Sequence, residues 1–175
     1  MKIASSFAVV VFVLIAMIAT LGHIDGSVTF GEPPLNTSSD TLPITGEEEA
    51  YLRFVVGTLQ GVSSDISSLG MLFSNPEFDN DEWKAAITVL LNRIESAPEM
   101  IVPLESSARL HAFQEASVAA VSHGAEFAGL IRIQLQQGQS NMTDDAAIEL
   151  MAAAEAFGQA EYLLNRFLDE HPIPE

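Results

Sequence analysis

Proline placement is the feature that most constrains the fold of this chain. Beyond residue 45, proline occurs only at positions 76, 98, 103, 172 and 174. Because a proline inside a helix costs about 3 kcal/mol, the long proline-free stretches between these positions can be helical throughout. Their apolar residues recur at steps of three and four, and no run alternates with the period of two that a half-buried strand requires. The sequence therefore predicts an all-α domain.

The first helix is predicted to begin at Thr45, because Thr45-Gly-Glu-Glu48 has the pattern of a capping box. Asn75-Pro76 is predicted to end it. Gly57 and Gly61 have GxxxG spacing, which here indicates a close helix approach or chance rather than dimerisation. The predicted core stripe is Tyr51, Val55, Leu59, Val62, Ile66, Leu69 and Phe73. The predicted solvated face, which could alternatively bind a glycan or a partner, is Arg53, Gln60, Ser63, Ser64 and Ser67.

The second helix is predicted to begin near Asp79 to Asp81 and to stop at Pro98. Trp83 opens its apolar stripe, and we expect it to anchor the core. The apolar, proline-bounded segment from Ala97 to Pro103 is predicted to cross one end of the core as an extended strap.

The third helix is predicted from about Leu104 to Gln137, with Gly138 as its C-cap. The fourth begins with Thr143 as N-cap and ends at His171-Pro172. Four amphipathic helices with short connections predict an antiparallel up-down four-helix bundle over residues 46–171, followed by a tail at 172–175.

An uncharged run from Ile3 to Leu21 precedes this domain, with Lys2 before it. As a helix its 19 residues span about 28 Å, close to the thickness of a bilayer's hydrocarbon core. We expect residues 1–21 to be a signal-anchor transmembrane helix that contacts the lipid bilayer; the alternative is a cleaved signal peptide. Either places the rest of the chain outside the cytoplasm, at the cell membrane or as a secreted or periplasmic protein. Residues 22–45 have the composition of a flexible linker.

The charge balance constrains the partners. The chain has 24 Asp and Glu against 7 Lys and Arg, for a net charge of −17. Nucleic acid, which is densely negative, is therefore not an expected partner. An unknown protein partner remains possible.

Several kinds of site are absent from the sequence. There is no cysteine, so thiol catalysis and zinc–thiolate sites are excluded. The Asp79-Asn80-Asp81 run lacks the later ligands of a calcium loop, and we interpret it as a helix N-cap. No nucleophile elbow or Glu-x-x-His pair occurs. Met71 and Met151 lie near the core stripes, and we interpret them as apolar filling rather than haem ligands.

Two His/Glu pairs of the third helix have residue types and a spacing that could indicate a metal site. His111 and Glu115 are four residues apart, and His123 and Glu126 are three apart, so each pair lies on one helix face. Both pairs are predicted to point away from the core. Each provides only two ligands, where zinc requires three or four. We therefore expect no metal site, and we name no catalytic or cofactor-binding residue.

The predicted function is that of a membrane-tethered or secreted extracytoplasmic helical bundle. It would act as a non-enzymatic interaction, accessory or envelope-structural module. The alternative is a periplasmic helical bundle that binds a small ligand or a metal, and a less favoured third class is a hydrolase without a recognisable motif.

Overall fold

The computed structural model describes residues 42–139 and 142–171. These residues form four α-helices and one turn of 3-10 helix, with no strand, which confirms the all-α prediction. The elements are α2 (Gly46–Ser74), α3 (Asp81–Ile101), η1 (Ala108–Leu110), α4 (His111–Gln136) and α5 (Asp144–Glu170). The helix predicted at residues 1–21, nearly all of the predicted linker and the tail at 172–175 lie outside the described residues. Among the residues described, no helix combines the length and hydropathy needed to cross a bilayer.

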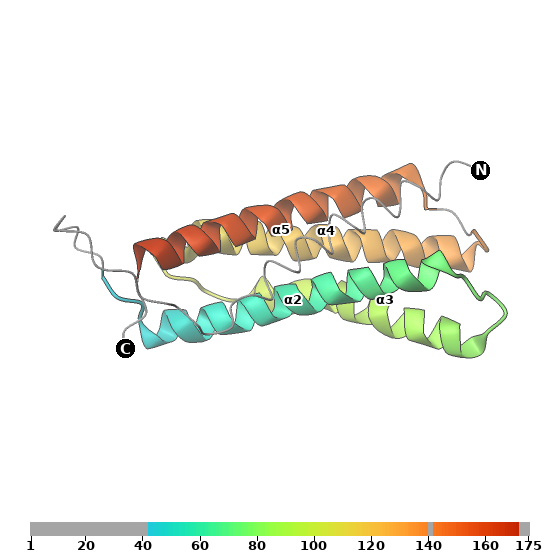
Figure 1. The fold of residues 1–175 in the computed structure, drawn as a ribbon, viewed down its shortest axis with the longest axis horizontal. Coiled ribbons are helices and arrows are strands. Elements are labelled where there is room, and N and C mark those ends of the chain that lie inside the picture. Colours follow the sequence, from blue (N-terminus) through green and yellow to red (C-terminus); the bar gives the residue numbers. More distant parts are fainter. Residues whose placement is uncertain (1–41, 140–141, 172–175) are drawn as a thin grey trace, which may run out of the picture.

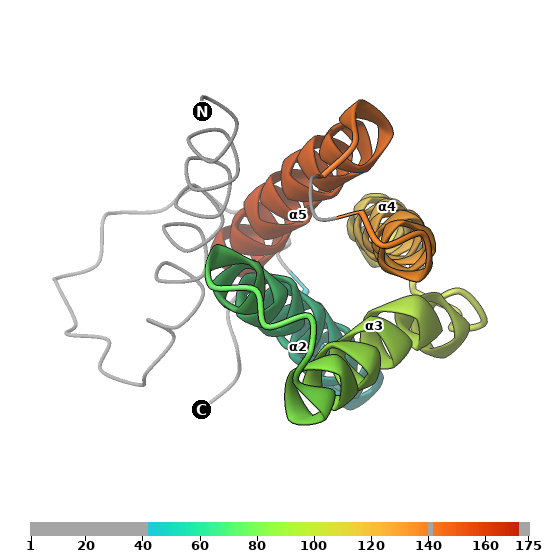
Figure 2. The same ribbon diagram turned by 90° about the vertical axis from the view of Figure 1, so that its right-hand side faces the viewer.

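The helices form a bundle in which successive helices run in opposite directions (Figure 1). Viewed from the end, the four helices surround a common centre (Figure 2). Contact is most extensive between α4 and α5, and it is also substantial between α3 and α4 and between α2 and α3. The backbones of α2 and α5 approach each other closely at almost no point. The bundle is therefore packed least tightly between its first and last helices.

Local capping fixes where the helices begin and end. Thr45 and Glu48 form the predicted capping box, and the Asn80 side chain accepts hydrogen bonds from the N–H groups of Glu82 and Trp83. The Thr143 hydroxyl accepts from the N–H of Ala146. Gly138 has a φ of 68°, the left-handed conformation predicted for a C-cap. These caps were readable from the sequence because each depends on residues within one helical turn.

The core consists of the apolar faces of all four helices. Val55, Leu59, Val62, Ile66 and Leu69 are buried as predicted. Tyr51 and Phe73, which begin and end that stripe, are partly buried against the core. The largest wholly buried side chains on the other helices include Ile87, Leu91, Ile94, Ile101, Phe127 and Leu150.

Trp83 closes the end of the core where α2 passes into α3. Its ring is 6% exposed and meets the rings of Phe73 and Phe78 edge-on. Its indole N–H donates to the Leu72 carbonyl oxygen at 3.2 Å. The predicted core position is confirmed, and the polar atom of the indole is satisfied within it.

The predicted end of the second helix was wrong. Pro98 lies inside α3, which continues to Ile101. Ala97 and Ile101 are both fully buried, and the Val102 N–H donates to the Pro98 carbonyl oxygen at 2.9 Å. Burial of these two side chains offsets the backbone hydrogen bond that proline cannot make.

The predictions of an extended strap at Ala97–Pro103 and of a third helix that begins near Leu104 were therefore also wrong. The non-helical connection covers residues 102–107, and α4 begins only at His111 after η1. Gln114 of α4 fixes this connection, because its amide nitrogen donates to the Leu104 carbonyl and its amide oxygen accepts from the Ser106 hydroxyl. A side chain ten residues away in sequence thus competes with helix formation at Leu104.

Two predictions about the surface of the first helix also change. Ser63 and Ser67 are buried, although they were predicted to be solvated. A Cβ atom on Gly57 or Gly61 would meet nothing within 4 Å, so the described helices make no close approach there. Small side chains at Ser63 and Ser67 are compatible with either environment, which is why periodicity of large apolar residues alone misplaced them.

Replacing Trp83 with Ala is expected to lower the free energy of unfolding by about 3–5 kcal/mol, because a buried aromatic ring and its packing are lost. The measurement is urea unfolding followed by circular dichroism. Val89→Ala on the same helix is the matched control, since Val89 is 53% exposed and should cost less than about 0.5 kcal/mol. A Trp83→Ala loss as small as that of the control would contradict the core assignment.

Candidate functional site

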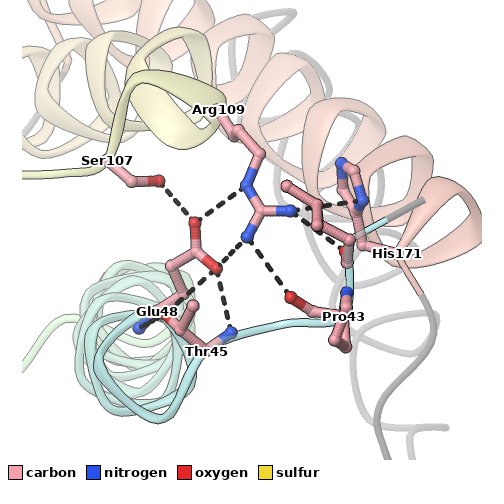
Figure 3. Close-up of polar contacts among 7 residues, drawn as sticks. Pro43, Thr45, Glu48, Ser107, Arg109 and His171 are labelled. Carbon is pink, nitrogen blue, oxygen red and sulfur yellow. Dashed lines mark hydrogen bonds and ion pairs between the residues drawn. The ribbon is translucent and has the colours of Figure 1, made fainter. Parts of the chain in front are cut away.

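A polar cluster joins three separate elements at one end of the bundle (Figure 3). The Glu48 carboxylate, in the first turn of α2, forms an ion pair with Arg109 of η1. Ser107 donates its hydroxyl to the same carboxylate at 2.7 Å. Arg109 also contacts the Nδ1 atom of His171, at the end of α5, at 3.5 Å. One arginine therefore connects the start of α2, the turn before α4 and the end of α5.

The same arginine holds the segment through which the chain enters the domain. Its guanidinium donates to the carbonyl oxygens of Leu42 at 3.1 Å and Pro43 at 3.4 Å. Its Cζ atom lies 5.8 Å from the centre of the Phe167 ring, within the range of a cation–π contact. The cluster is thus a clamp on the junction between the predicted linker and the bundle.

Glu48 is buried, and its environment favours the charged form. Burial alone would raise its pKa. The hydrogen bonds from the Thr45 N–H, Ser107, Arg109 and the Thr45 hydroxyl outweigh that effect and lower the pKa to about 2. The sequence identified Glu48 only as a helix cap. Arg109 was not singled out, because its partners lie about sixty residues away in sequence.

A shallow apolar groove lies where α2 and α5 face each other. It is lined by Val56, Leu59 and Gln60 of α2, Phe113 of α4, and Phe157, Glu161 and Leu164 of α5. Its enclosed part has room for about one water molecule, and the rest of the hollow is open to solvent. Almost all of the surface lining it is apolar.

Exposed apolar side chains extend along both margins of this α2–α5 groove. Met71 lies eleven residues after Gln60, three turns further on the same face of α2. Tyr162 follows Glu161, and Met151 lies eleven residues before Tyr162 on the same face of α5. Met71, Met151 and Tyr162 are 63%, 53% and 61% exposed. The interpretation of Met71 and Met151 as core filling was therefore wrong, because each lies at the margin of its helix's apolar stripe.

The margin on α5 is also acidic. Glu161 lines the groove, while Glu155 and Asp169 are exposed and lie seven residues before and after Tyr162 on the same helix face. None of the three carboxylates pairs with a Lys or Arg of the described chain. This edge of the groove is negative and uncompensated.

All six Lys and Arg side chains of the described ranges are engaged in ion pairs elsewhere. The pairs are Arg53–Glu49, Lys84–Asp81, Arg93–Asp65, Arg109–Glu48, Arg132–Glu95 and Arg166–Glu170. The Asp65 carboxyl is buried, and burial raises its pKa although Arg93 opposes the shift. The cations thus serve mainly to hold the chain's own carboxylates, and the remaining carboxylates face solvent or one another.

The two His/Glu pairs of α4 have different surroundings. His111 and Glu115 are both exposed, with His Nε2 and Glu Oε1 3.3 Å apart, as expected for a solvated pair. The His123–Glu126 pair is joined by Glu149 of α5, whose Oε2 lies 2.7 Å from His123 Nδ1. One candidate ligand atom from each of these three residues lies within 4.8 Å of the other two. The premise of only two ligands therefore fails for this pair, because spacing within one helix could not reveal a carboxylate contributed by the next.

Comparison with known proteins provides no assignment, since the chain matches no family model, no curated protein and no solved structure.

Replacing Glu48 with Gln is expected to lower the free energy of unfolding by about 3 kcal/mol at pH 7, the equivalent of a pKa held at about 2 instead of 4.5. Because the folded-state pKa is depressed, this contribution is complete above about pH 4.5 and is lost as the pH falls towards 2. The measurement is urea unfolding of both proteins across this range. Their difference should shrink with acidification.

Glu49→Gln is the control for the neighbouring, half-exposed carboxylate, whose pair with Arg53 should contribute less than about 1 kcal/mol. If Glu48→Gln and Glu49→Gln have the same small effect at every pH, the clamp does not stabilise the fold.

Proposed function

We propose that this protein is a membrane-tethered, extracytoplasmic helical bundle that acts as a non-enzymatic interaction module. In this proposal the run from Ile3 to Leu21 spans the bilayer, and residues 22–45 connect it to an up-down four-helix bundle. The α2–α5 groove binds an amphipathic helix of a partner protein, with the apolar face of that helix in the groove and its Lys and Arg side chains beside α5.

The observation that carries the proposal is the apolar groove between α2 and α5. The hollow is lined by the half-buried Val56 of α2 and by the buried side chains of Phe157 and Leu164 of α5. Met71, Met151 and Tyr162 then extend an apolar surface along both margins. Helices commonly bind in such grooves by inserting side chains spaced three and four residues apart.

Charge supports a cationic partner. Glu155 and Asp169 are fourteen residues apart, close to four helical turns, and therefore lie on one face of α5, while Glu161 lies between them at the groove. A partner helix lying beside α5 could match them with basic residues at similar spacing. Complementary charge of this kind mainly increases the association rate and the specificity, while apolar burial stabilises the complex.

The location of the clamp supports a tethered module. Arg109 binds the carbonyl oxygens of Leu42 and Pro43, where the chain enters the bundle. The lining of the groove on α2 begins at Val56, about two helical turns from Glu48, so a partner can bind without displacing the junction.

The tether predicts that the full-length protein stays in the membrane fraction. After alkaline carbonate washing it should remain in the pellet, because a hydrophobic helix of this length resists extraction. Release of the intact chain into the supernatant, or a mature protein whose N-terminus lies between His23 and Ser27, would contradict the tether.

The groove can be tested with a designed peptide of leucine and lysine that forms an amphipathic helix of about four turns. Fluorescence anisotropy with the full-length protein in nanodiscs of zwitterionic lipid should give saturable binding after subtraction of empty nanodiscs. Glu161→Lys should weaken binding by about fivefold or more, because it places a like charge at the margin. Glu99→Lys on α3, which is exposed and does not line the groove, should change it by less than about twofold.

A second peptide, with serine in place of leucine, separates groove binding from charge attraction. It keeps every positive charge but has no apolar face, so it should not bind saturably. Equal binding of the two peptides, or equal loss with Glu161→Lys and Glu99→Lys, would contradict the proposed groove.

A further inference from the structure

We propose that His123, Glu126 and Glu149 form a binding site for a divalent transition-metal ion of the zinc type, at the surface between α4 and α5. This inference is independent of the proposed groove, whose lining residues on these helices are different.

The geometry brings three suitable ligands together. His123 and Glu126 are three residues apart on one face of α4, and Glu149 comes from the second turn of α5. One nitrogen and two carboxylate oxygens lie within 4.8 Å of one another. In a tetrahedral zinc site with bonds of about 2.0–2.2 Å, neighbouring ligand atoms are about 3.3 Å apart, so small side-chain rotations suffice.

The supporting helices make the arrangement rigid. α4 and α5 have the most extensive contact of any helix pair in the described chain. The side chains of His123 and Glu149 are only 39% and 23% exposed, so their rotamers are restricted by the neighbouring helix. Ligands held by packed helices lose less conformational freedom on metal binding than ligands on loops.

The electrostatics also favour a cation. The two fully buried carboxylates of the described chain each pair with an arginine: Glu48 with Arg109, and Asp65 with Arg93. Glu149 contacts a histidine instead, and a second carboxylate, Glu126, lies in the same cluster. All six Lys and Arg side chains of the described ranges are paired elsewhere, so no permanent positive charge remains to offset these two negative charges.

Three protein ligands leave at least one coordination position for water or for a donor from another molecule. Zinc sites with one nitrogen and two oxygen ligands fit the preferences of this ion, as histidine and glutamate are both ordinary zinc ligands. Binding would connect α4 to α5 across their outer surface and should raise the stability of the folded state.

The chain contains its own comparison site. His111 and Glu115 have the same residue types on the same helix but lie in water, with side chains 67% and 70% exposed. The proposed site differs from this pair by a third ligand from α5 and by burial. Removing His111 should therefore leave the zinc affinity unchanged, whereas removing His123 should lower it.

The test is isothermal titration of tag-free, full-length protein in zwitterionic nanodiscs with zinc chloride. One ion should bind per chain, and the affinity should fall about tenfold or more in His123→Gln and in Glu149→Gln, because each loses one of three ligands. His111→Gln should remain within about twofold of the parent protein.

Two further measurements keep the test decisive. Circular dichroism will show whether each variant is folded. If removing the interhelical contact of Glu149 unfolds the chain, Glu126→Gln replaces it, since Glu126 is exposed and should weaken zinc binding without loss of structure. Zinc should also raise the melting temperature of the parent protein and not that of His123→Gln. The absence of saturable binding, or equal losses in His111→Gln and His123→Gln, would overturn the proposed site.

Discussion

The ion pair between Glu48 and Arg109 is the interaction on which the arrangement of the bundle most depends. It is the point where the start of α2, the turn before α4 and the end of α5 meet. These elements are far apart in sequence, and α2 and α5 contact each other little along their length. The Glu48 side chain is only 6% exposed and that of Arg109 26%, so loss of Arg109 would leave a buried carboxylate without its counter-ion. This one ion pair therefore joins α2 to α5 at one end of the bundle, although the two helices make few contacts along the rest of their length.

A shortage of positive charge is common to the acidic margin of the groove and to the His123 cluster. The six Lys and Arg side chains in the described residues all bind carboxylates of the same chain. The carboxylates that remain have no Lys or Arg partner, and they include those of the α5 margin and Glu126 and Glu149 beside His123. Both places would gain from an external cation: a basic helix beside the groove and a metal ion between α4 and α5.

The sequence predicted the helices and their caps well, because these depend on residues within one or two turns. Thr45, Asn80, Thr143 and Gly138 act where local patterns placed them. Errors arose where tertiary contacts decide the outcome. Pro98 remains helical because Ala97 and Ile101 are buried, and Leu104 is held by Gln114. The contacts of Arg109 and Glu149 could not be predicted, since their partners come from other helices and a helical period contains no information about which neighbour faces it.

We propose the apolar groove between α2 and α5, with its acidic margin, as the surface that binds a partner helix. It is tested most directly by methyl NMR of the full-length protein, with labelled Val, Leu and Met, during titration with the leucine–lysine peptide. Binding in the groove should shift the methyl signals of Val56, Leu59, Leu164 and Met151. The methyl groups of Val89 and Met100, which are exposed on α3, should not move. Shifts of equal size on α3, or none in the groove, would contradict binding at the α2–α5 groove.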